Sequence, residues 1–167
     1  MEGYEVVDNF LSPYLFNKIA FQINPVSNYA GENISWNYCK AVGSGGDLGN
    51  NMYFTNLIYS NTILNEKYFK ILKELRDKLD IKALIRIKLN LYTRTDYLVH
   101  HDDHIDYPFS HKGGLFSLNT CDGFTVIDGK EIPSVANRMI FFDPSIPHHS
   151  TNCTNAPHRM NININYF

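Results

Sequence analysis

The sequence of 167 residues lacks any uninterrupted apolar run long enough to cross a membrane, which argues against a membrane protein. It has only three cysteines, Cys39, Cys121 and Cys153, and no CxxC pair, so reduced thiols are expected rather than a disulfide framework or a cysteine zinc site. There is no basic run and the net charge is −2, so nucleic acid is not an expected partner. The first residues lack the basic flank and apolar run of a signal peptide, and the expected location is therefore the cytoplasm.

Several motifs that would indicate other enzymes are also missing. The glycine cluster at residues 43–46 lacks the Lys-Ser/Thr ending of a phosphate-binding loop and predicts a loop, not a nucleotide site. There is no HExxH motif, internal repeat, linker or low-complexity tract. The length favours one domain spanning residues 1–167, with helical support over about residues 1–80 and a β core over about residues 81–167.

Two segments in the first half have helical periodicity. Residues 11–23 place apolar side chains near one face, and Ser12-Pro13 is a possible helix start with the proline in the first turn. Residues 66–79 repeat apolar side chains at spacings of three and four, which predicts a single helix packed on the core.

After residue 80 the pattern changes to the two-residue period of strands. Over residues 81–95 one face carries Ile85, Ile87, Leu89 and Leu91, and the other carries Arg86, Lys88, Asn90 and Tyr92. Further strands are predicted at residues 4–7, 36–38, 115–118, 124–127, 138–143 and 159–167. Asp122-Gly123 and Asp128-Gly129 are typical of hairpin turns. Two helices followed by many short strands predict an α+β, mainly β protein, with a sandwich or barrel.

The last predicted strand has one entirely polar face. Arg159, Asn161, Asn163 and Asn165 alternate with Met160, Ile162 and Ile164. Asparagine is poor in strands, so three of them on one face need a reason. Exposure to solvent and a hydrated cavity both remain open as explanations.

Residues 99–108 contain three histidines and three acids, and this density indicates a metal site. His104 and Asp106 form a His-x-Asp pair, whose side chains project to the same side of an extended segment. His100/Asp102 and His101/Asp103 satisfy the same pattern, so the register stays open on this ground alone. His148 or His149 could add a third ligand, and two histidines with one carboxylate form the facial triad of non-haem Fe(II) oxygenases.

The order of these features resembles the Fe(II)- and 2-oxoglutarate-dependent dioxygenases, particularly the small prolyl-4-hydroxylase-like members of phages and bacteria. The resemblance covers roughly half of the chain. Its segments are residues 90–92, 104–107, 118–119, 137–143, 148–150 and 159–163.

That resemblance implies a double-stranded β-helix, or jelly roll, with the N-terminal helices packed on one sheet. It implies His104, Asp106 and His148 as iron ligands, because Tyr107 follows the acid as in relatives and His148 begins their His-x-Ser pattern. His101/Asp103 and His149 remain alternative ligands.

The resemblance also implies a cosubstrate site. Arg159 would bind the distal carboxylate of 2-oxoglutarate, since a guanidinium holds a carboxylate with two parallel hydrogen bonds. Tyr92 and Asn90 would lie nearby, and Asn161 stands where many relatives carry serine or threonine, which leaves the second carboxylate contact open. The expected residues of the rim or substrate site are Tyr107, His101, His149 and Trp36.

The implied activity is hydroxylation of an unactivated C–H bond with Fe(II), 2-oxoglutarate and O2, releasing succinate and CO2. A small-molecule or peptidyl substrate is expected, with peptidyl proline as the first choice, and the host cytoplasm is the expected location if the protein is viral. Two alternatives are a non-catalytic jelly-roll or cupin-like binding module and a metal-dependent hydrolase. The oligomeric state is not predicted.

Overall fold

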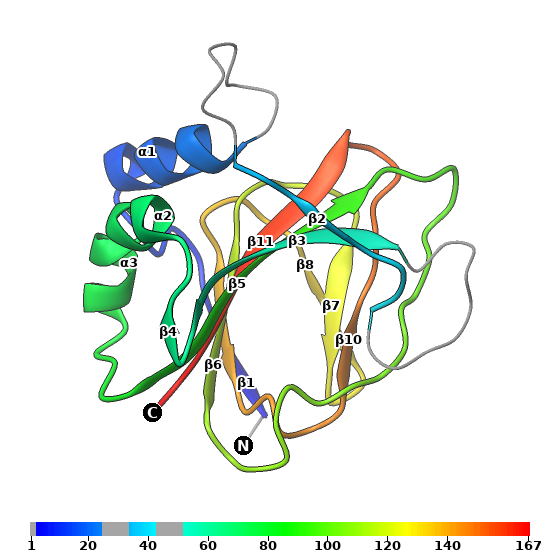
Figure 1. Ribbon diagram of the computed structural model, residues 1–167. Coiled ribbons are helices and arrows are strands. Elements are labelled where there is room, and N and C mark those ends of the chain that lie inside the picture. Colours follow the sequence, from blue (N-terminus) through cyan, green and yellow to red (C-terminus); the bar gives the residue numbers. More distant parts are fainter. Residues whose placement is uncertain (1–2, 25–33, 43–51) are drawn as a thin grey trace.

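A computed structural model describes residues 3–24, 34–42 and 52–167 of the chain. Two β-sheets face each other, and three helices cover the outer side of the larger sheet (Figure 1). The predicted α+β, mainly β class and its double-stranded β-helix core are confirmed. The glycine cluster at residues 43–46 lies outside the described residues.

The helices are α1 (Pro13–Ile23), α2 (Glu66–Ile71) and α3 (Lys73–Lys78). The strands of the larger sheet are β1 (Tyr4–Val7), β2 (Asn37–Cys39), β3 (Tyr53–Ser60), β4 (Thr62–Ile63), β5 (Leu84–Thr93), β6 (Lys112–Ser117), β9 (Met139–Phe142) and β11 (His158–Tyr166). The smaller sheet contains β7 (Phe124–Ile127), β8 (Lys130–Pro133) and β10 (His148–Ser150).

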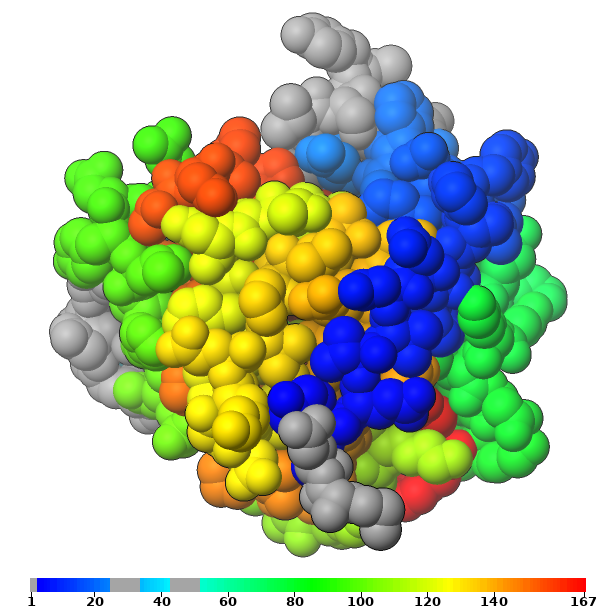
Figure 2. All heavy atoms as spheres, turned by 180° about the vertical axis from the view of Figure 1, so that it is seen from behind, coloured from blue at the N-terminus to red at the C-terminus, as the bar shows by residue number. Residues whose placement is uncertain are grey.

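The strand order places the two most polar strands side by side in the middle of the larger sheet. That order is β1-β9-β6-β11-β5-β3-β2, with β4 paired to β3, and the smaller sheet runs β10-β7-β8. All of these pairs are antiparallel, and β1 lies along β9 at one edge, as Figure 2 shows from behind. The pairing of β5 with β11 sets Tyr92 opposite Arg159 and Lys88 opposite Asn163.

Hydrophobic residues form a separate cluster on each side of the larger sheet. Its outer side packs on the helices, with Ile19, Leu72 and Leu89 all fully buried. Leu115 and Ile127 belong to a smaller cluster whose residues come from both sheets. The polar inner faces of β5 and β11 therefore face the space between the two sheets.

Helix α1 begins where the sequence indicates. The Ser12 hydroxyl accepts a hydrogen bond from the Leu15 amide at 3.4 Å, and Pro13 occupies the first turn. The apolar stripe is confirmed, since Ile19 and Ile23 are buried against the sheet. Among the described residues no helix is both long and apolar enough to span a bilayer.

The prediction of one continuous helix over residues 66–79 is wrong. Leu72 ends α2 and precedes α3, with a ψ of 9° that lies outside the α-helical region. Its side chain is fully buried, and Tyr68 and Leu75 on either side are buried too. The local bend brings both short helices onto the same core, which periodicity alone does not reveal.

One of the two predicted hairpin turns is confirmed. Asp128 and Gly129 both have positive φ, 50° and 68°, as a tight turn joining β7 to β8 requires. Asp122-Gly123 forms no hairpin, because β6 and β7 belong to different sheets. Gly123 serves close packing instead, since a Cβ there would lie 2.2 Å from the Asn152 carbonyl oxygen.

Asn137 connects the start of α1 to the larger sheet. Its amide oxygen accepts from the Leu11 amide at 2.9 Å and its amide nitrogen donates to the Leu11 carbonyl at 2.8 Å. The residue is buried and has a φ of 63°, which asparagine tolerates better than alanine does. We expect Asn137→Ala to lower the free energy of unfolding by about 2–4 kcal/mol, measured by urea denaturation.

Asn61 provides a matched control for that prediction. It also has a positive φ, 57°, but its side chain is exposed. Asn61→Ala should therefore cost only the conformational part, about 1 kcal/mol. Equal losses in the two variants would show that the Asn137 side-chain hydrogen bonds contribute nothing.

Candidate functional site

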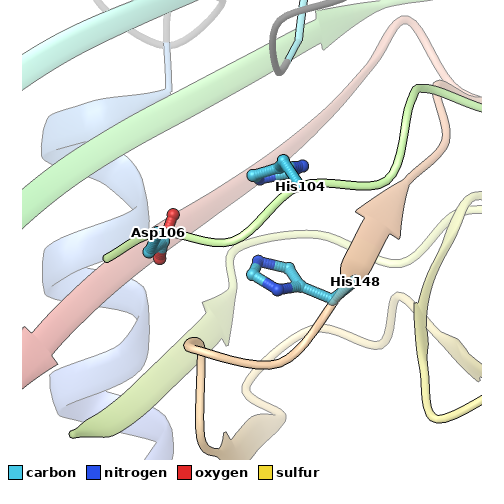
Figure 3. Close-up of side chains that lie close together, drawn as sticks. All are labelled: His104, Asp106 and His148. Atoms are coloured by element: carbon cyan, nitrogen blue, oxygen red, sulfur yellow. The ribbon is translucent and has the colours of Figure 1, made fainter. Parts of the chain in front are cut away.

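Two distant segments meet at a single pair of histidines. His104 follows β5 in an extended segment and His148 begins β10, and each backbone amide donates to the other's carbonyl at 3.0 Å. Asp106 lies two residues after His104. The three side chains converge, with one ligand atom from each lying within 4.8 Å of the others (Figure 3). This is the only such group of metal-binding side chains found in the described part of the chain.

Hydrogen bonds fix which ring nitrogen faces the centre of this group. His148 Nδ1 lies 3.0 Å from the Ile146 carbonyl, and His104 Nδ1 lies 3.3 Å from the Asp102 carbonyl. Each Nδ1 therefore carries the proton, and each Nε2 keeps its lone pair for a metal. Burial lowers the pKa of both histidines, so the rings are neutral at physiological pH.

Asp106 is held in place by three neighbouring side chains. Arg86 Nη2 lies 2.7 Å from Oδ1, and the amides of Asn165 and Asn163 donate to Oδ2 at 2.9 and 3.2 Å. Burial alone would raise the pKa of Asp106, but Arg86 and Asn165 outweigh burial and hold the pKa below its usual value. The carboxylate is thus ionised and oriented.

The alternative ligands point elsewhere. Asp103 is mostly exposed and pairs with His149 Nδ1 at 2.6 Å, and His149 Nε2 lies 3.3 Å from His100 Nδ1. His101 is buried, stacks on Tyr92 and bonds Ser150 at 2.8 Å. Burial together with the nearby Arg159 charge lowers the pKa of His101 to about 3. The geometry favours His104, Asp106 and His148, whose role as metal ligands remains a prediction.

A cavity of about 470 Å³ opens between the two sheets beside these three residues. Its apolar wall includes Val42, Leu115 and Phe142. Its polar lining is Tyr53, Arg86, Lys88, Asn90, Tyr92, His104, Asp106, Thr125, His148, His149, Ser150, Asn161 and Asn163. Of the two explanations for the polar face of the last strand, the cavity is correct, because Asn161 and Asn163 are buried and line it.

Solved structures with similar folds include prolyl hydroxylases and an alpha ketoglutarate dependent epimerase. A prolyl hydroxylase from Trichoplax adhaerens, in complex with a peptide fragment of a hypoxia inducible factor, aligns at a TM-score of 0.67 and 15% identity over 100% of this chain and 84% of its own. A Pseudomonas putida prolyl-4-hydroxylase aligns at 0.63 and 15% identity over 98% and 92% of the two chains. The viral collagen prolyl hydroxylase of Paramecium Bursaria Chlorella virus-1 aligns at 0.54 and 12% identity over 98% and 94%.

No protein-family model matches the sequence, and no curated protein matches it either. The structural likeness extends over nearly the whole chain at low identity, and it therefore establishes the fold. The chain has the double-stranded β-helix fold of the 2-oxoglutarate-dependent Fe(II) oxygenases. In this oxygenase fold the triad and the cavity lie between the two sheets.

Arg159 lies behind the lining of the oxygenase-fold cavity and is fully buried. Its Nη1 donates to the Thr151 carbonyl at 2.7 Å and its Nη2 donates to the Thr125 hydroxyl at 2.7 Å. The guanidinium is 5.4 Å from the centre of the Tyr92 ring. Thr125 and Tyr92 both line the cavity, so a carboxylate held by them would lie next to the Arg159 charge.

The other predicted residues divide into two groups. Asn90 and Asn161 line the cavity, and Asn90 donates to the Asn161 amide oxygen at 2.8 Å. Trp36 packs against the outer core and Tyr107 packs against Phe109, and neither is among the cavity-lining residues. Their predicted place at the substrate site gains no support from this arrangement.

Sequence reasoning assigned no role to Arg86 or Lys88, although both line the cavity. They share the polar face of β5 with Asn90 and Tyr92, which the sequence did predict as site residues. The two-residue alternation therefore indicated that all four side chains share one face of the strand. Burial lowers the pKa of Lys88 to about 8, so its ammonium is still mostly charged at pH 7.

That lowered pKa implies a stability cost. Below about pH 8 the ammonium is charged in the folded and unfolded states, and its burial destabilises the fold. We expect Lys88→Met to raise the free energy of unfolding of the metal-free protein at pH 7 by about 1–3 kcal/mol, measured in urea. The difference should shrink as pH rises from 8 toward 10.5, because folded Lys88 then loses its proton first.

Lys112→Met is the matched control for the stability measurement. Lys112 is exposed on β6, with its ammonium 6.0 Å from the centre of the Tyr166 ring. Its replacement should change the free energy of unfolding by no more than about 0.5 kcal/mol. If the Lys88→Met protein is no more stable than the wild type at pH 7, burial of the Lys88 ammonium does not destabilise the fold.

Proposed function

We propose that the protein is an Fe(II)- and 2-oxoglutarate-dependent dioxygenase that hydroxylates an unactivated C–H bond. The observation that carries this proposal is the convergence of His104, Asp106 and His148 beside an open cavity, with both Nε2 atoms free of protons. Two imidazoles and one carboxylate suit Fe(II) and leave positions for other ligands. The fold shared with known 2-oxoglutarate oxygenases supports the same conclusion.

Each residue of the site has a distinct part in this proposal. His104, Asp106 and His148 would hold the iron, which together with 2-oxoglutarate and O2 supplies the oxidising chemistry that yields succinate and CO2. Arg86, Asn163 and Asn165 orient the Asp106 carboxylate, as outer-shell partners of metal ligands do.

The cosubstrate would extend from the triad toward the other end of the polar face. Thr125 and Tyr92 offer hydroxyl groups to its distal carboxylate, and Arg159 lies directly behind them. Burial raises the pKa of Tyr92, so its hydroxyl keeps its proton and can donate to a carboxylate. The apolar residues Val42, Leu115 and Phe142 of the cavity wall reduce the access of water to the cavity as a whole.

We propose that the substrate is peptidyl and that proline is the first choice for the residue that is hydroxylated. This proposal rests on similarity, since the Trichoplax adhaerens neighbour is a prolyl hydroxylase in complex with a peptide fragment. A succinate-release screen of peptides, amino acids and other small metabolites tests it directly. Stimulation by metabolites but by no peptide would reject the peptidyl assignment while leaving the dioxygenase intact.

An anaerobic titration tests the reaction class before any substrate is known. Fe(II) and 2-oxoglutarate added together should produce a weak visible charge-transfer band that neither ligand produces alone. Air should then yield slow succinate formation without added substrate. A non-catalytic jelly-roll module would give neither signal, and a metal-dependent hydrolase would bind metal with no response to 2-oxoglutarate.

A further inference from the structure

Two cations project from β5 into the cavity, and only one of them has a counter-ion. Asp106 is the sole carboxylate among the described cavity-lining residues, and Arg86 is already paired with it at 2.7 Å. Among the described residues Lys88 forms no ion pair within 4 Å; its ammonium lies 5.7 Å from the centre of the Tyr53 ring, and Asp106 attracts it only at longer range. The cavity thus contains an ammonium group that the described residues leave unpaired.

Lys88 remains unpaired when the proposed metal and cosubstrate are considered. The divalent metal ion, Arg86 and Arg159 together carry more positive charge than the 2-oxoglutarate dianion and Asp106 carry negative charge, so no negative charge is left over for Lys88. A buried ammonium without a counter-ion costs free energy, and such groups are concentrated at sites where a ligand supplies the missing charge. A molecule that enters the cavity with an anionic group would supply this charge.

The position of Lys88 separates it from the proposed place of the cosubstrate carboxylate. Lys88 lies opposite Asn163, whereas Tyr92 lies opposite Arg159, four residues or roughly 13 Å farther along β5. The Lys88 ammonium lies 5.7 Å from the centre of the Tyr53 ring on β3, and the other neighbours of Tyr53 include Val42 and Tyr92, whose ring stacks on it at 5.5 Å. The separation from the cosubstrate carboxylate therefore rests on the position of Lys88 along β5, four residues before Tyr92, and on the contact of Arg159 with Thr125.

We propose that Lys88 is a specificity-determining residue that forms an ion pair with an oxyanion, a carboxylate or a phosphate, of the molecule to be oxidised. This proposal rests on the dioxygenase function proposed above, and it adds the chemical class of the substrate. Apolar contacts with Val42 and Phe142 would accompany the ion pair, so the favoured ligand joins an acidic group to a compact apolar body.

Three small aromatic probes test the charge preference without knowledge of the natural substrate. Phenylacetate and phenyl phosphate carry the two oxyanions, and phenylacetamide is the neutral analogue of the first. Binding of each is measured by equilibrium dialysis to the anaerobic complex of the protein with Fe(II) and saturating 2-oxoglutarate. We expect at least one anion to bind at least tenfold more tightly than phenylacetamide, and the tighter anion identifies the oxyanion.

Variants then assign the preference to one residue. Lys88→Met should reduce the affinity for the preferred anion at least tenfold, to the level of phenylacetamide, and Lys88→Arg should restore most of it. Lys112→Met removes an exposed lysine beside Tyr166, outside the cavity, and should retain the full preference. Thermal unfolding of each variant shows that it is folded at the temperature of the binding assay.

Two outcomes would overturn the proposal. In one, the wild-type complex binds the anions no better than phenylacetamide, or Lys88→Met keeps the preference. In the other, Lys88→Met weakens 2-oxoglutarate as strongly as the probes, which would place the lysine in the cosubstrate site. Failure of the dioxygenase function has a different signature, because no charge-transfer band forms and the probes can still be tested on the metal-free protein.

Discussion

Replacing Asp106 with alanine is expected to abolish both Fe(II) binding and 2-oxoglutarate turnover. Asp106 provides the only carboxylate of the triad, and two imidazoles alone hold a divalent metal far less tightly. Succinate formation should fall at least about 1,000-fold, because without bound metal no step of the reaction remains accelerated. Anaerobic metal titration and succinate release measure the two losses separately.

The same substitution also removes the partner of Arg86. The two side chains are 3% and 17% exposed, and loss of one member of such a buried pair typically costs about 3–5 kcal/mol. Inactivity of Asp106→Ala could therefore reflect unfolding rather than loss of a ligand. The double variant Asp106→Ala/Arg86→Met removes the unpaired charge and should recover much of the lost stability without recovering activity.

Full 2-oxoglutarate turnover by a folded Asp106→Ala protein would reject the assigned metal site. It would direct attention to Asp103, the acid of the alternative register. Asp103 is 69% exposed and pairs with His149, so its carboxylate is not directed toward His148. Asp103→Ala should accordingly retain metal binding, and the pair of variants distinguishes the two registers.

Local sequence patterns predicted part of the strands and the spacing of the site, but they missed β3, β4, β8 and β10, although β3 and β4 lie in the region expected to be helical support. The two-residue alternation of β5 and β11 predicted which side chains share a face, and the Asp128-Gly129 turn was found from its residue types. The His-x-Asp spacing also predicted that His104 and Asp106 project together, which the structure shows.

What the patterns could not supply was the partner of each side chain. The choice between three His-x-Asp registers depends on the backbone pairing of His104 with His148, which lie 44 residues apart in sequence. Likewise, Asp106 is paired with Arg86 and Asn165 through contacts between residues that are distant along the chain. Alternation places residues on a face, but it does not reveal what that face meets.

The asparagine face of β11 illustrates the same limit. Its polarity was compatible with solvent or with a hydrated cavity, and only the opposing sheet decides between them. Asn161, Asn163 and Asn165 are buried, and the Asn163 amide oxygen has no hydrogen-bond partner among the described residues. The other hydrogen bonds of this face are made with Asn90, Asp106 and His111.

Arg159→Met is expected to raise the 2-oxoglutarate concentration for half-maximal turnover about 100-fold while Fe(II) binding is retained. Its guanidinium is the positive charge next to Thr125 and Tyr92, where the distal carboxylate is proposed to bind. Loss of one charge-assisted interaction in a buried site costs about 1.5–3 kcal/mol, or roughly 10- to 150-fold, and full burial of Arg159 favours the upper part of this range. Methionine preserves much of the side-chain volume, so the fully buried position is not left empty.

Arg76→Met controls for the structural part of the Arg159 substitution. Arg76 also lies over an aromatic ring, 3.7 Å from the centre of Phe69, and its guanidinium also donates to a backbone carbonyl, that of Phe69 at 3.1 Å. It is distant from the cavity lining, so its loss should affect stability and leave the 2-oxoglutarate requirement unchanged. The charge role has a further signature, because Arg159→Met should hardly alter the weak binding of a 2-oxo acid that lacks the distal carboxylate. If both 2-oxo acids weaken equally, Arg159 merely supports the wall of the cavity, and Lys88 becomes the next candidate for the cosubstrate carboxylate.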